Sequence, residues 1–199
     1  MRRLLSLLLL LVLGCGGPQV QVSPLGEAAE GWTVATPRAL GDLLDVEAEV
    51  GPLLDDGAWP RCTTHSGSKA LLASADAVRK GLAPSDAEHR VLVTDRHVAV
   101  DRPGAPCTRV FGAAPPGTGV VLVSSRELRS RCSALPVDEL VARVAAHELG
   151  HALGLTPDDD GTACDARGCH CTDPDCLLAD ARGGCPPADA TLCARCARR

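Results

Sequence analysis

Three residues in the C-terminal half have the types and the spacing of a hydrolytic metal site. His147 and His151 stand four residues apart, and Glu148 directly follows the first histidine. Residues four apart on a helix project from the same face, so both imidazoles can reach one Zn²⁺ at about 2.0–2.1 Å. A carboxylate beside the first histidine can accept a proton from a water molecule at the metal. The spacing therefore predicts two zinc ligands and a general base on one helix.

The stretch HELGHALGLTPDDD, residues 147–160, continues with a glycine but without a third ligand at the short spacing. A residue with positive φ at Gly154 would end the helix and turn the chain back toward the metal. Three residues further on stands Pro157, which has no atom that can bind a metal. Either the motif is damaged, or the third ligand lies elsewhere in the chain.

The element that must position these side chains is a helix from Val137 to about Leu153. Pro136 suits its start, and acidic residues in the first turn are favourable to the helix dipole. Apolar residues recur along one face toward the histidines, which anchors the site to the core: Val137, Leu140, Val141 and Val144.

The segments before this helix predict an α+β layout. Four short β-rich runs, separated by Pro/Gly turns, are expected to form strands: 90–95, 97–100, 108–114 and 119–125. Residues 66–82 have apolar side chains at helical spacing and predict a helix. Residues 31–60 are expected to supply the first strand. The run TRVFGAA, 108–114, is the candidate edge strand beside which a peptide could bind.

The N-terminus carries an export signal. Two arginines precede an apolar run that is too short to span a bilayer, and Val12-Leu13-Gly14-Cys15 resembles the bacterial lipobox, in which the cysteine is lipidated. We expect residues 1–14 to be a lipoprotein signal peptide, 15–31 a flexible tether, and 32–199 one domain. The alternative is an ordinary signal peptide cut near Gly14 or Gly17. Lipidation would place the domain in the bacterial cell envelope, at the outer membrane rather than the inner.

Composition excludes some functions and narrows others. The formal net charge is −5 and no basic run stands out, so nucleic acid is not an expected partner. The chain contains no tyrosine, so no phenol can assist an oxyanion during hydrolysis. We expect a monomer.

The tail is rich in cysteine. Cys171 and Cys176 form a C-x4-C, and Cys193 and Cys196 form a CxxC. Two close pairs separated by a loop are typical of a tetrahedral four-thiolate zinc site. Because thiolate ligands and disulfides compete in oxidising compartments, oxidation of all four cysteines is the alternative.

The combined pattern resembles the archaemetzincins. That family carries HExxHxxGxxH, then C-x4-C-x-M, then CxxC, where this chain has HELGHALGL, HCTDPDCLL and CARC. The strand block RVLVTD to VFGAAPPGTGVVLVSSREL is also similar, so the resemblance covers roughly residues 50–199. It implies a compact zincin- or metzincin-like α+β domain with a mixed twisted sheet, an active-site helix, and two zinc ions per chain, one catalytic and one structural.

The resemblance makes His170 the third ligand of the catalytic zinc. His170 follows His151 by 19 residues where the family pattern has six, so 13 residues are inserted within about 156–169. Asp158 or its neighbour Asp159 is the rival ligand. By the same resemblance, the four tail cysteines hold the structural zinc. Leu178 replaces the methionine that packs beneath the metal, a swap of similar volume.

Six cysteines remain after Cys15 and the four tail cysteines are set aside: Cys62, Cys107, Cys132, Cys164, Cys169 and Cys185. An even number in an exported protein predicts up to three disulfides of unknown pairing. Pairing of Cys164 with Cys169 would pinch the insertion into a small loop.

These observations together predict a zinc metallopeptidase that acts on peptides or proteins. Zinc at the three histidines would acidify a water molecule, and Glu148 would accept its proton. The alternative is an inactive zinc-binding envelope lipoprotein with a scaffold or binding role.

Overall fold

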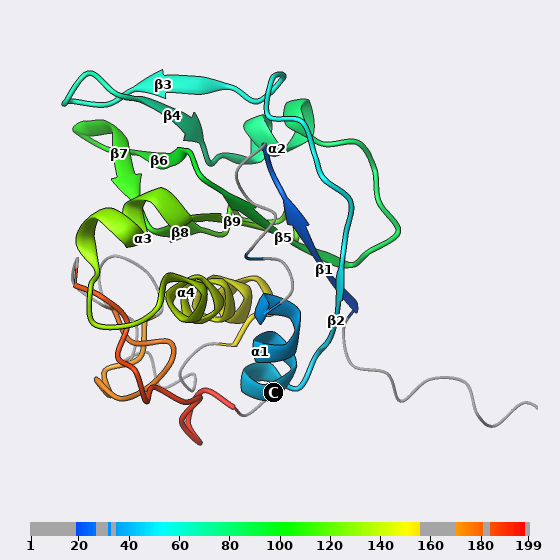
Figure 1. The fold of residues 1–199 in the computed structure, drawn as a ribbon, viewed down its shortest axis with the longest axis vertical. Helices are drawn as coiled ribbons and strands as arrows, with labels where there is room; N and C mark the ends of the chain where they lie inside the picture. The colour runs from blue at the N-terminus through cyan, green and yellow to red at the C-terminus, as the bar shows by residue number, and fades with distance from the viewer. Residues whose placement is uncertain (1–18, 27–31, 33–34, 156–169, 181–183, 198–199) are drawn as a thin grey trace, which may run out of the picture.

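The computed structural model describes residues 19–26, 32, 35–155, 170–180 and 184–197. They form an α+β domain in which helices pack on both sides of a mixed sheet, three on the face that carries the main core and one on the other (Figure 1). The helices are α1 (Ala35–Leu44), α2 (Ala75–Gly81), α3 (Ser125–Arg131) and α4 (Val137–Ala152). The strands are β1 (Gln19–Pro24), β2 (Glu47–Val50), β3 (Arg61–Thr63), β4 (Lys69–Leu72), β5 (His89–Thr94), β6 (His97–Arg102), β7 (Ala105–Val110), β8 (Gly112–Ala113) and β9 (Val120–Ser124).

A five-stranded sheet supports the site helix. Its order is β2-β1-β5-β9-β8, parallel except for β8, which pairs antiparallel with β9 along one edge. α4 packs on this sheet beside α1, and the C-terminal tail lies against the opposite side of α4 (Figure 1). Valines of the strands and leucines of the helix form the main core, including Val91, Val121, Leu140 and Leu149. The site helix is therefore held between the sheet and the tail.

A four-stranded sheet of order β3-β4-β6-β7 covers the other end of the domain. A disulfide between Cys62 of β3 and Cys107 of β7 joins its two outer strands. The sequence predicted one mixed sheet. The structure has strands in mixed directions, but their hydrogen bonds form two sheets, one of five strands and one of four.

The expected tether of residues 15–31 is wrong over Gln19–Pro24. These residues form β1, which lies between β2 and β5 and pairs in parallel with both. Val20 and Val22 are 1% and 0% exposed. The alternating QVQV pattern is the period-two signal of a strand, and it lay too close to the Gly- and Pro-containing segment to stand out. The domain thus begins no later than Gln19, not at residue 32.

In the described part of residues 31–60, a helix comes before any strand. Ala35–Leu44 is α1, with Pro37 in the first turn, where its missing N–H costs little. Its buried residues Thr36, Leu40 and Leu44 follow helical spacing. A strand, β2, comes only after the helix.

The helix expected over 66–82 is confirmed only in its second half. Lys69–Leu72 forms β4, which pairs with β3 and β6, and α2 starts after Ser74, whose Oγ accepts the N–H of Ala77 at 3.1 Å. A short apolar run such as ALL is compatible with a helix or with a strand. Here the pairing with β3 and β6 makes it a strand. Strands β5, β6 and β9 and helix α4 appear where the sequence predicts them, whereas the run predicted over 108–114 is divided between the end of β7 and β8, which belong to different sheets. Among the described residues, no helix is long and apolar enough to cross a membrane.

Candidate metal and peptidase site

Helix α4 carries the first part of the site. Its core-facing side is buried at Leu140, Val144 and Leu149, as the apolar stripe predicts. Gly154 has φ +72°, and the N–H of Leu155 donates to the carbonyl of Gly150 at 2.9 Å, which closes the helix end. The glycine therefore has the conformation that the sequence analysis assigned to it.

The structure brings His170 to His147 and His151. One ligand atom from each of the three imidazoles lies within 4.8 Å of the others. The two Nε2 atoms of His147 and His151 are 3.2 Å apart. Two nitrogens bound tetrahedrally at 2.0–2.1 Å would be about 3.3 Å apart, so this pair fits one zinc ion. Asp158 and Asp159, the rival ligands, lie outside the described residues.

The tail also orients the first histidine. Nδ1–H of His147 donates to the carbonyl of Leu177 at 2.8 Å, which leaves Nε2 to face the other histidines. Burial lowers the pKa of His147, and the charge of Asp180 opposes that shift. Burial, with the charges of the other two histidines, lowers the pKa of His151 to about 3. Neutral imidazole is the form that binds a metal.

Glu148 lies between α4 and the edge strand β8. Its carboxylate lines the same cavity as His147 and His170 and accepts a hydrogen bond from the backbone N–H of Ala114. Burial raises its pKa to about 7 against the effects of His170 and of that hydrogen bond. A Cβ on Gly112 would lie 2.8 Å from Cγ of Glu148. Only a glycine at this point of β8 leaves space for the glutamate side chain.

Leu178 packs against the site helix at Gly150, the residue before His151. It is 0% exposed, and a Cβ on Gly150 would lie 2.6 Å from its Cδ2. The carbonyl of Leu178 accepts the N–H of Cys171 at 2.8 Å. The leucine thus packs against the site helix, and its carbonyl closes the loop that carries Cys171 and Cys176.

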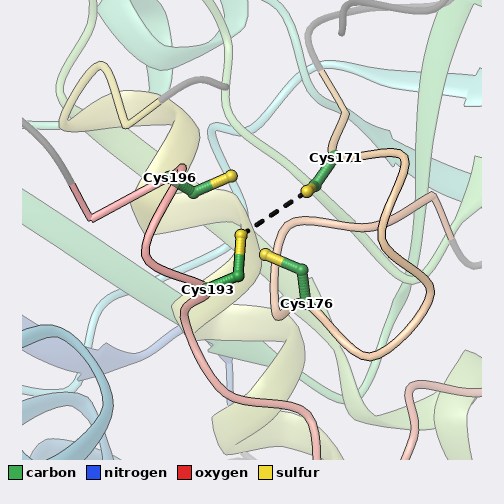
Figure 2. Close-up of side chains that lie close together, drawn as sticks. All are labelled: Cys171, Cys176, Cys193 and Cys196. Atoms are coloured by element: carbon green, nitrogen blue, oxygen red, sulfur yellow. Dashed lines mark hydrogen bonds between the residues drawn. The ribbon is translucent and has the colours of Figure 1, made fainter. Parts of the chain in front are cut away.

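The four tail cysteines form a second cluster (Figure 2). Their side chains converge from two loops, none is in a disulfide, and three of them are buried. Sγ of Cys171 and Sγ of Cys193 are 3.6 Å apart. Two sulfurs bound tetrahedrally at 2.3 Å would be about 3.8 Å apart, whereas a disulfide measures about 2.05 Å. The donor set fits zinc, and the oxidised alternative is not what the structure contains.

Two of the six remaining cysteines pair near the cleft. Cys132, which follows α3, is bonded to Cys185 of the tail. With Cys62–Cys107, two of the three predicted disulfides are present. Cys15, Cys164 and Cys169 lie outside the described residues.

A cavity of about 270 Å³ runs along the site. It is bounded by the end of β7 and by β8, by α4, and by residues 176–180 and 186–190 of the tail. Its volume lies just below the range of roughly 300–1,000 Å³ that is typical of small-ligand sites.

Sequence reasoning missed several residues of this site. Asp180 affects His147, and Gly112 makes room for Glu148. Both residues are distant in sequence from the residue that they affect, so no local pattern reveals their roles. Helix α3 was also missed, although Ser124 and Glu127 have the S-x-x-E spacing of a capping box, and Oγ of Ser124 accepts the Glu127 N–H at 3.1 Å.

The fold is that of zinc peptidases of the archaemetzincin type. The structure resembles archaemetzincin from Methanopyrus kandleri with a TM-score of 0.62 and 18% identity, over 94% of this chain and 95% of that one. For archaemetzincin from Archaeoglobus fulgidus, solved with malonate, the values are 0.59 and 20%, over 90% and 98%. A zinc-dependent peptidase from Methanocorpusculum labreanum gives 0.54 and 18%, over 89% and 97%.

Sequence comparison supports the same class. Residues 119–197 match the model of the Reprolysin (M12B) family zinc metalloproteases. A search of curated proteins found no significant match. The shared fold and the local match together indicate a zinc metallopeptidase, a hydrolase.

Proposed function

We propose that the protein hydrolyses peptide bonds with a zinc ion held by His147, His151 and His170 and with Glu148 as general base. The observation that carries this proposal is the convergence of three imidazole donors beside a carboxylate in one cavity. Zinc, when bound, would act as a Lewis acid and make a water molecule nucleophilic at neutral pH.

The protein's own part in the reaction is proton transfer and orientation. Glu148 would accept the proton of the attacking water as the new C–O bond forms, and would pass it to the amine as the C–N bond breaks. The N–H of Ala114 holds the carboxylate in place. Leu177 fixes the ring of His147 through its carbonyl.

The substrate backbone would bind along β8. In the described sheet, β8 is the last strand on its side, paired only with β9, and Gly112 lies against Glu148. An extended peptide added to this edge would lie beside the carboxylate. The predicted segment 108–114 contains this strand.

Replacement of the base tests the mechanism. Glu148→Gln keeps the shape of the side chain but cannot accept the proton, so we expect zinc content to be unchanged and peptide hydrolysis to fall at least about 100-fold. Glu88→Gln, a matched change at an exposed glutamate, should leave both unchanged. Turnover by the Glu148→Gln protein at the wild-type rate would refute the assignment.

Metal analysis tests the third ligand and the number of ions. We propose two zinc ions per chain, the second held by Cys171, Cys176, Cys193 and Cys196. His170→Ala should remove one ion and leave the cysteine-bound one. Retention of both ions and of activity in that variant would instead favour Asp158.

A peptide library separates an enzyme from a scaffold. An active peptidase should cleave members of a mixed library in a zinc-dependent manner. Zinc binding at both sites without any cleavage would support the binding role.

We propose that the domain is anchored in the bacterial envelope through a lipid at Cys15. Because β1 begins at Gln19, three residues separate it from Cys15, and an extended chain over those four residue-to-residue steps spans at most about 14 Å. The domain would therefore lie close to the membrane surface, as a monomer. Replacement of residues 1–15 by a signal peptide that is cleaved without lipidation should release the protein from membranes, and size-exclusion chromatography of the released domain should give a monomer. Continued membrane association of that variant would contradict lipid anchoring.

A further inference from the structure

The wall of the cavity is basic, in contrast to the chain as a whole. Its lining includes Arg102, Arg109, Arg131 and Arg143, whereas the acidic side chains on the described lining are Glu148 and Asp180. The whole chain has a formal net charge of −5. The described lining therefore carries more positive than negative side chains, whereas the chain as a whole is acidic.

Two of these arginines share one buried carboxylate. Glu127 of α3 is 1% exposed; its Oε1 lies 3.6 Å from Nε of Arg109, and its Oε2 lies 4.0 Å from Nη1 of Arg131. Nδ1 of His97 also contacts the carboxylate. Glu127 thus supplies one negative charge to two guanidinium groups that stay positive at every physiological pH, so this carboxylate by itself does not neutralise both.

The two guanidinium groups remain accessible from the cavity. The side chains of Arg109 and Arg131 are 38% and 42% exposed. The guanidinium of Arg131 also lies 4.6 Å from the centroid of the Phe111 ring, a cation–π contact that orients its planar face. Glu127 and Phe111 therefore hold two donor groups in place before any ligand binds.

Arg143 has a different role. Its side chain is 14% exposed, and it donates to Glu139 at 3.1 Å and to the carbonyl of Ala190 at 3.1 Å. Arg143 therefore holds the tail against α4 and forms part of the cavity wall. Arg102, at the end of β6, is exposed and adds to the field of the cleft.

The position of these groups relative to the substrate follows from the strand order. Arg109 stands three residues before Gly112, the residue of β8 that lies against Glu148. At about 3.3 Å per extended residue, that separation is at most roughly 10 Å. Because an arginine side chain itself covers several ångströms of this distance, a peptide along β8 would bring a residue one or two positions from the scissile bond within reach of Arg109 and Arg131.

We propose that the cleft selects substrates with a carboxylate one or two residues from the scissile bond, bound by Arg109 and Arg131. The carboxylate is either an Asp or Glu side chain or the free C-terminus of the peptide. The inference rests on the proposed peptidase function. Arginine donates charge-assisted, often paired, hydrogen bonds to carboxylates, so a matched amide should bind about 10–100-fold more weakly.

Matched peptides test this preference. A fluorogenic peptide with Glu beside the scissile bond and an amidated C-terminus is compared with its Gln twin in kcat/KM. In a second arm, the Gln peptide is offered with a free or an amidated C-terminus. A preference of about 10-fold or more in either arm supports the proposal and identifies the source of the carboxylate; equal rates in both arms overturn it.

Variants assign the effect to the arginines. Arg109→Gln combined with Arg131→Gln should abolish the discrimination, and Arg131→Lys should retain part of it because the charge remains. Arg79→Gln, on the exposed face of α2 and outside the cavity lining, is the matched control and should retain the full preference. Thermal melting shows that each variant is folded. Full discrimination by the folded double variant would overturn the assignment.

Binding separates this proposal from the peptidase function. The zinc-loaded Glu148→Gln protein is titrated with labelled Glu and Gln peptides, and fluorescence anisotropy gives Kd. Tighter binding of the carboxylate peptide that weakens with added salt supports the inference even if the wild type cleaves nothing. Cleavage by the wild type without any carboxylate preference in rate or binding refutes this inference and leaves the proposed function intact.

Discussion

The variant Gly112→Ala should displace Glu148 without removing any side chain of the site. It therefore tests whether the position of Glu148, and not only its presence, is needed for activity. The added Cβ would lie 2.7 Å from Cγ1 of Val144, 2.8 Å from Cγ of Glu148 and 3.2 Å from the carbonyl oxygen of Leu122. Carbon atoms in contact prefer about 3.5–4.0 Å, so strand and helix must separate by about 0.8 Å or more. Overpacking of this kind costs about 1–3 kcal/mol, and a displacement near 1 Å at a reacting group lowers the rate about 100-fold.

The assay combines kcat, zinc content and thermal melting on one protein preparation. We expect kcat to fall by about 100-fold with zinc content unchanged, and Tm to fall by about 2–4 °C for each kcal/mol lost. Gly41→Ala is the matched control, because its Cβ would meet only the carbonyl oxygen of Val46 at an ordinary 3.4 Å. A Gly112→Ala protein with wild-type kcat would refute the claim that close packing of β8 positions Glu148.

Three further predictions follow from packing and charge. Leu178→Met should cost less than about 1.5 kcal/mol in urea unfolding, whereas Leu178→Ala should cost about 2–5 kcal/mol, since the side chain is fully buried; equal losses would contradict the packing role. Cys196→Ser should lower the zinc content by one ion per chain and reduce Tm, as measured by metal analysis and calorimetry; two bound ions would contradict the four-thiolate site. Glu127→Gln should destabilise the fold by about 2–3 kcal/mol, below the roughly 3–5 kcal/mol of a fully buried pair because Arg109 and Arg131 are partly exposed; an unchanged midpoint of urea unfolding would contradict the role of this carboxylate.

Local chemistry made the active-site helix predictable. Periodicity, the proline before its first turn and the final glycine all act within a few residues of the position they determine. Strands β5, β6 and β9 were predictable for the same reason, because their runs of β-branched residues suit no other element. The pairs of tail cysteines were recognisable as a ligand set from their spacing alone.

Other elements depended on partners distant in the sequence. Gln19–Pro24 became a central strand because β2 and β5 offer hydrogen bonds on both sides. Lys69–Leu72 became a strand instead of the first turns of a helix because β3 and β6 pair with it. Neither pairing is visible in a window of ten residues, so composition suggested a tether in one case and periodicity a helix in the other.

The sequence by itself determined the chemistry of this protein: two histidines and a glutamate at helical spacing, a third histidine downstream, and four cysteines in two pairs. Only the tertiary structure decided which of these side chains meet. His170 approaches the helix because Leu177 and Leu178 hold the tail against it, through one hydrogen bond to His147 and one buried side chain packed on Gly150. The basic wall arose in the same way, since Arg109 and Arg131 come from different elements and meet at the buried carboxylate of Glu127. Spacing describes what a short segment can do, whereas contacts between distant segments depend on the free energy of the whole packed core.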